Sequence, residues 1–175
     1  GFDKETILIV DRENNDVHIL KTTDLKTGNV NPIRLNNTGI AGGTFTLHSG
    51  AVVGDHIYAV NLSGGQASPL KIYHWTDPSQ APNVIADINI ANIPGAGVRH
   101  GDNFSIGLDE NGNGYMFFGD NAATRVLRFS VTNFTTISDP VVFNMPVTGA
   151  GSWTTYTRIG NTDEYLFTGH DAAIY

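Results

Sequence analysis

The chain has 175 residues, enough for one domain with its own core, and 40% of them are hydrophobic. It contains no cysteine, which excludes disulfides, thiolate catalysis and cysteine-ligated zinc. The 17 acidic and 10 basic residues give a net charge of −7, and since lysine and arginine do not cluster, no nucleic-acid partner is expected.

The first patterned stretch, "ILIVDRENNDVHILKTTD" at 7–24, predicts an apolar strand, a polar loop and a second strand. Similar stretches begin at Ile57, Tyr115 and Tyr165, so the starts lie 50, 58 and 50 residues apart. A polar turn, a third strand, a glycine-rich link and a fourth strand follow each of the first three. This period predicts repeated four-stranded antiparallel units.

The strands of one unit differ in how they are patterned. "ILIV" and "YMFF" are apolar on consecutive residues, which predicts strands packed on both faces. The outer strand "NVIADINI" at 83–90 alternates, which predicts a half-solvated strand. No amphipathic helix of useful length is expected, and no apolar run is long enough to cross a membrane. The sequence therefore predicts an all-β fold.

These units resemble those of secreted β-propellers, and their Asn-, Thr- and Gly-rich style is similar to that of uncharacterised propeller lipoproteins of gut Bacteroidetes. The resemblance implies a β-propeller of four-stranded antiparallel blades, with one domain over 2–175 and blades at about 2–38, 39–93, 94–148 and 149–175. It also implies a secreted, periplasmic or cell-surface protein. Because the first and last units are incomplete, we expect the chain to be part of a larger propeller of about six to eight blades.

In such a fold the site is expected where the loops 11–16, 61–68, 119–125 and 169–173 meet the glycine-rich links. The link "PGAGVRHGDN" is the longest and brings together Arg99, His100, Asp102 and Asn103. The same face is expected to hold Asp120, Trp153, His170 and Asp171. These residue types hydrogen-bond a sugar or peptide, with Trp153 stacking on it. The alternative is that they cap strand ends and satisfy loop backbone.

Two metal sites are open alternatives. His100, Asp102 and His170 combine ligand types that suit divalent ions, although their spacing is looser than in most such sites. Asp109, Asn111, Asn113 and Asp120 fall on ligand positions of an EF-hand-like calcium loop. The Asn-Gly pair in that stretch favours a β-hairpin instead, so no cofactor is expected.

The sequence contains neither a Gly-x-Ser-x-Gly nucleophile motif nor a phosphate-binding loop. The leading hypothesis is therefore a non-catalytic binding or scaffold domain with a carbohydrate or protein ligand on the loop-rich face. One alternative is a hydrolase or lyase that acts on a glycan through His100, Asp102 and Asp120. Another is a structural module that oligomerises through the edges of its sheets.

Overall fold

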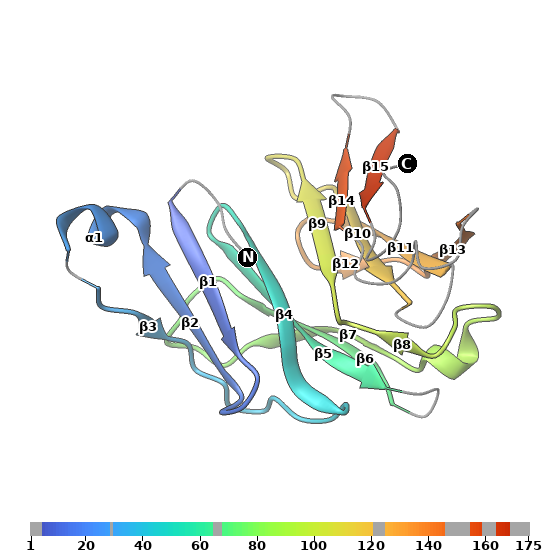
Figure 1. The fold of residues 1–175 in the computed structure, drawn as a ribbon, viewed down its shortest axis with the longest axis horizontal. Coiled ribbons are helices and arrows are strands. Elements are labelled where there is room, and N and C mark those ends of the chain that lie inside the picture. Colours follow the sequence, from blue (N-terminus) through green and yellow to red (C-terminus); the bar gives the residue numbers. More distant parts are fainter. Residues whose placement is uncertain are drawn as a thin grey trace.

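Antiparallel strands make up most of the molecule, as the sequence predicts (Figure 1). The computed structural model describes residues 5–28, 30–64, 68–120, 125–145, 155–158 and 164–168. Its strands are β1 (Thr6–Asp11), β2 (Asp16–Lys21), β3 (Ile33–Arg34), β4 (Phe45–Val53), β5 (His56–Gly64), β6 (Leu70–Trp75), β7 (Asn83–Ile88), β8 (Arg99–His100), β9 (Phe104–Leu108), β10 (Gly114–Gly119), β11 (Arg125–Thr132), β12 (Thr136–Ile137), β13 (Val141–Asn144), β14 (Thr155–Arg158) and β15 (Tyr165–Thr168). The helical elements are α1 (Thr22–Thr27) and the 3-10 helix η1 (Ile90–Asn92).

The described strands form separate antiparallel sheets in chain order. The first sheet is β1-β2-β3, and the second is β4-β5-β6-β7, with β8 pairing to the end of β5. The third is β9-β10-β11-β12, with β13 also pairing to β11, and β14 pairs with β15. Among these residues the sheets do not close into a ring (Figure 1). The all-β prediction is confirmed.

Strand β5 is buried along nearly its whole length because sheets cover both of its faces. Tyr58 and Val60 point into the cluster shared with the third sheet, whereas Ile57 and Ala59 pack towards the first sheet. Alternate residues therefore serve two different cores. This is why the sequence is apolar on consecutive residues at this strand.

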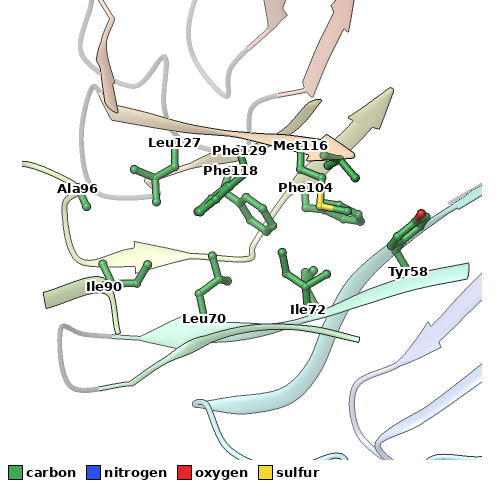
Figure 2. Packing of buried hydrophobic residues seen from close by; sticks show 12 residues of the cluster. Tyr58, Leu70, Ile72, Ile90, Ala96, Phe104, Met116, Phe118, Leu127 and Phe129 are labelled. Carbon is green, nitrogen blue, oxygen red and sulfur yellow. The ribbon is translucent and has the colours of Figure 1, made fainter. Parts of the chain in front are cut away.

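The larger cluster fills the space between the second and third sheets (Figure 2). Leu70 and Ile72 of the second sheet face an aromatic group made of Phe104, Phe118 and Phe129. The ring centroids of Phe104 and Phe118 lie 5.4 Å apart, and Phe129 meets Phe118 edge-on at 5.6 Å. Both separations are in the range where aromatic pairs attract beyond simple burial, by about 1 kcal/mol each.

The first and second sheets approach each other closely at Gly50 of β4. A Cβ at this position would lie 2.6 Å from the carbonyl oxygen of Tyr58 and 2.7 Å from the Leu8 side chain. No side chain fits in that space, because real Cβ atoms do not approach other atoms so closely. Glycine therefore allows β1 to lie directly on β4.

The structure differs from the sequence prediction in four local respects. The polar turn expected after β2 is the short helix α1, and β3 has only two residues. Strand β7 ends at Ile88, because the Asn89 side chain accepts a hydrogen bond from the Ala91 amide (3.0 Å) and begins η1. A register shift in the β6–β7 pairing breaks the expected alternation. No helix in the described part of the chain is long and apolar enough to span the membrane.

Candidate functional site

The link that the sequence singles out, residues 92–103, packs onto the second and third sheets. Its β8 segment pairs with the end of β5, placing His100 opposite Ser63. Gly97 has a φ of +91°, and a Cβ there would lie 1.8 Å from Oδ2 of Asp120 at the end of β10. The link is therefore held by close backbone approaches as well as by its side chains.

Arg99 and Asp102 form a bidentate ion pair within this link. The Arg99 Nε donates to Asp102 Oδ2 at 2.8 Å, and its Nη2 donates to Asp102 Oδ1 at 2.5 Å. The Asp102 side chain is 1% exposed, whereas 42% of the Arg99 side chain remains in solvent. The Arg99 amide also donates to Asp120 Oδ1 at 3.3 Å. Paired in this way, the buried carboxylate of Asp102 fixes the direction of a partly exposed guanidinium.

His100 and Asp120 are inaccessible to a ligand in this structure. His100 is fully buried, with its Nε2 2.9 Å from the Ala96 carbonyl oxygen, and Asp120 is 1% exposed. Burial lowers the pKa of His100, and the charge of Asp120 opposes that shift. Asn103 is partly exposed beside them. His100, Asp102 and Asp120 thus stabilise the link from inside.

A row of rings and charges connects this ion pair to the surface. His48 of β4 places its Nε2 3.8 Å from Asp102 Oδ1, and its ring stacks with Phe45 at a centroid distance of 6.1 Å. The Arg12 guanidinium lies over the Phe45 ring, 4.5 Å from its centroid. Burial lowers the pKa of His48; the Asp102 charge opposes this, and the charges of Arg12 and Arg99 add to it. Both guanidinium groups are therefore close enough to act on one imidazole.

The outer end of this row opens into a groove of about 450 Å³, here called the loop-end groove. It lies where the β1–β2 turn meets the beginning of β4 (Figure 1). Its lining residues are Arg12, Glu13, Asn15, Thr44, Phe45 and Thr46. Phe45 is 38% exposed, and the Thr46 hydroxyl donates to the Asn15 side-chain oxygen. Among the described residues, no carboxylate forms an ion pair with Arg12.

The proposed calcium ligands do not converge. Asp109 Oδ1 accepts hydrogen bonds from the amides of Asn111 (2.9 Å) and Asn113 (2.8 Å), which closes a tight hairpin turn. Asp120 lies beyond the far end of β10, about 20 Å away at the usual rise of a strand. Within the described ranges, no three histidine or acidic side chains gather where a metal ion could be held. Trp153, His170 and Asp171 lie outside the described residues.

Two histidines, His56 and His74, lie in contact at the opposite end of the second sheet. His56 Nδ1 of β5 is 2.8 Å from His74 Nε2 of β6, and the His56 ring stacks flat on Phe134 of the third sheet, with centroids 3.7 Å apart. His74 is 3% exposed, and its Nδ1 has no hydrogen-bond partner. Burial, followed by the neighbouring His56, lowers the pKa of His74 to about 4. Burial also lowers the pKa of His56.

Sequence reasoning did not identify Phe45 or His48 as site residues. Arg12, Glu13 and Asn15 belong to the 11–16 loop, which the sequence assigned to the binding face without singling out a residue. Phe45 and His48 both lie in a stretch where the sequence predicts only the fourth strand of the first unit. The register shift between Phe45 and Ser49 moves Phe45 out of simple alternation. The only signal in the sequence was an aromatic residue at the start of a strand; its exposure is known from the structure.

Comparison with known proteins gives a family but no function. The family model described as a domain of unknown function (DUF4623) matches residues 1–175. A crystal structure of a DUF4623 family protein from Bacteroides eggerthii DSM 20697 is similar, with a TM-score of 0.92 and 45% sequence identity. The match covers 99% of this chain and 40% of that one, so the chain spans less than half the length of this relative. No curated protein matches the chain.

These matches correct the resemblance inferred from the sequence. The identification as a β-propeller repeat protein, similar to propeller lipoproteins of gut Bacteroidetes, is wrong. The family matched over the whole chain is DUF4623, and the strands form separate antiparallel sheets without a closed ring among the described residues. At β5 and β10, apolar clusters on both faces of the strand impose consecutive apolar residues, so similar strand patterns arise without a propeller.

Proposed function

Because the chain belongs to the DUF4623 family, a domain of unknown function, we propose a function from the site itself: a non-catalytic binding domain whose carbohydrate or protein ligand occupies the loop-end groove. One observation carries the proposal. Arg12, which has no ion-pair partner among the described residues, is stacked over the exposed Phe45 in an open groove. Aromatic and arginine side chains presented in this way are typical of binding surfaces.

The geometry of the row supports recognition by a rigid surface. Phe45 contacts both the Arg12 guanidinium and the His48 ring, and His48 in turn lies beside the buried Asp102. Side chains fixed before binding lose less rotamer entropy when a ligand arrives. Strand β4 supplies both Phe45 and His48, so the two rings of the row are held by a sheet and not by a loop.

The same structure disfavours the hydrolase or lyase alternative. That mechanism needs His100, Asp102 and Asp120 to reach a substrate, yet His100 and Asp102 are buried within the link and Asp120 is buried against it. A general acid or base must lie within hydrogen-bonding distance of the reacting group. None of the three lines the loop-end groove.

The proposal is tested by screening the 175-residue chain against arrays of glycans and peptides, with Phe45→Ala as the groove variant. We expect at least one ligand class to bind the wild type and to lose about tenfold or more in affinity with Phe45→Ala. A folded chain that binds nothing on either array would contradict the proposal. So would a bound glycan that is cleaved during incubation, since the domain would then be an enzyme.

A further inference from the structure

The proposed function leaves the class of ligand open, and the chemistry of the loop-end groove narrows it. We infer that the groove takes a neutral oligosaccharide, an assignment that rests on the groove being a binding site. A sugar ring presents a patch of C–H groups surrounded by hydroxyls that both donate and accept hydrogen bonds. A matching site needs one exposed aromatic surface surrounded by donors and acceptors together.

The lining residues supply that combination. Phe45 is the exposed ring, the Arg12 guanidinium offers only donors, and the Glu13 carboxylate offers only acceptors. The Asn15 oxygen is already used by the Thr46 hydroxyl, which leaves the Asn15 amide group as a further donor. A sugar hydroxyl can accept a hydrogen bond from a donor such as Arg12 and donate one to an acceptor such as Glu13.

The charge balance argues against an acidic ligand. A phosphate, sulfate or carboxylate group is bound best by cations without opposing charge. Here Glu13 lines the same groove as Arg12, and the Arg99 guanidinium at the other end of the row is already paired with Asp102. The charge of Glu13 therefore offsets that of Arg12, and a ligand without charge is not penalised.

The lining also argues against an apolar peptide. Phe45 is the one hydrophobic residue among the six lining residues, and the remaining apolar surface comes from carbon atoms of polar side chains, which suits the C–H patches of a sugar better than a leucine or valine side chain. The volume of about 450 Å³ falls in the range of about 300–1,000 Å³ usual for small-molecule sites. A short oligosaccharide fits both the size and the polarity.

Isothermal titration of the 175-residue chain with three probe sets tests the inference: neutral oligosaccharides of several linkages, an oligogalacturonate and an apolar peptide library. We expect at least one neutral oligosaccharide to bind, with an affinity that changes less than about twofold between 0.05 and 0.5 M salt, because screening acts on net charge. Phe45→Ala should weaken that binding about tenfold or more.

The chain offers a closely matched control. Phe143 is 37% exposed, close to the 38% of Phe45, and the Arg128 guanidinium lies 5.2 Å from its centroid. Phe143→Ala therefore removes an equally exposed ring with an arginine over it, but at β13, outside the groove. Neutral-sugar binding should survive this change, and far-UV circular dichroism should show both variants folded.

Each other outcome overturns the assignment in a recognisable way. Tighter, salt-sensitive binding of the oligogalacturonate would mean that the ligand is acidic, and peptide binding alone would mean that it is a protein. In both cases, if Phe45→Ala still abolishes binding, the proposed binding function survives while the ligand class fails. Equal losses of binding in Phe45→Ala and Phe143→Ala would mean that the groove is not the binding site. If no probe binds, the proposed binding function fails together with the ligand class.

Discussion

Replacing His74 with phenylalanine should remove much of the acid sensitivity of the folded chain. His74 is buried at the interface of the second and third sheets, and burial lowers its pKa from 6.5 to about 4. Above pH 6.5 the imidazole is neutral in both the folded and unfolded states, so it does not affect stability. Below pH 6.5 the unfolded chain takes up the proton first, and the folded state loses stability until it too protonates near pH 4.

The size of the effect follows from that difference in pKa. About 2.5 pH units separate 6.5 from about 4, and each unit corresponds to about 1.4 kcal/mol. His74 should therefore lower the free energy of unfolding by about 3 kcal/mol between pH 7 and pH 4. This is a large share of the about 5–15 kcal/mol that typically stabilises a domain.

Urea unfolding at several pH values between 7.5 and 4 measures this loss. Other groups titrate in the same range, so the informative quantity is the difference between wild type and His74→Phe. The variant keeps an aromatic ring against His56 but cannot take up a proton. Because every other titrating group is shared, the pH dependence of that difference reports His74 and its contact with His56.

Equal losses of stability in the wild type and His74→Phe would refute this reasoning. A direct measurement gives a second check, because the ring resonances of His74 report its protonation in the folded state. A midpoint at or above pH 6.5 would mean that the imidazole is not penalised by its surroundings. In that case the 2.8 Å contact with His56 would be holding a charged ring.

Three further variants test the link and the sheet interface. Gly97→Ala should lower the thermal midpoint, with a cost of about 2 kcal/mol or more, because a φ of +91° disfavours alanine and its Cβ would meet the Asp120 carboxylate; an unchanged midpoint would contradict the close approach. Arg99→Ala should cost about 2 kcal/mol in urea unfolding by leaving the Asp102 carboxylate buried without its bidentate partner, and Arg99→Lys should recover only part of it. Tyr58→Phe should cost about 1 kcal/mol, because the Tyr58 hydroxyl donates to a carbonyl of the β11–β12 turn at 3.0 Å; equal stability would rule that bond out as a contributor.

The strands were predictable where burial on both faces left no choice of residue. At β5 and β10 consecutive apolar residues pack into different clusters, and this pattern is visible in the sequence. The two-residue β8 was not predictable, because Arg99 and His100 lie in a glycine-rich link and pair with β5 only once the chain has folded back. Whether such a short strand forms depends on where the folded chain places it, and the strand propensity of its own residues contributes little.

The site was predictable only in part, for a physical reason. Polar residues in a loop are expected to be exposed, yet His100, Asp102 and Asp120 are buried because they bond to one another's segments and to backbone. Phe45, an apolar residue in a strand, is exposed although apolar residues are more often buried. In both cases the burial of the side chain is decided by how neighbouring sheets pack, and this cannot be read from the residue type alone.

The close approach at Gly50 has an evolutionary consequence. Any relative that lays its first strand on β4 in this way has the same missing space, so its sequence should carry glycine at the equivalent position whatever ligand it binds. Substitution there should be accompanied by a shift of the N-terminal sheet. This one position is therefore a marker by which members that share this sheet arrangement can be sorted from members that do not.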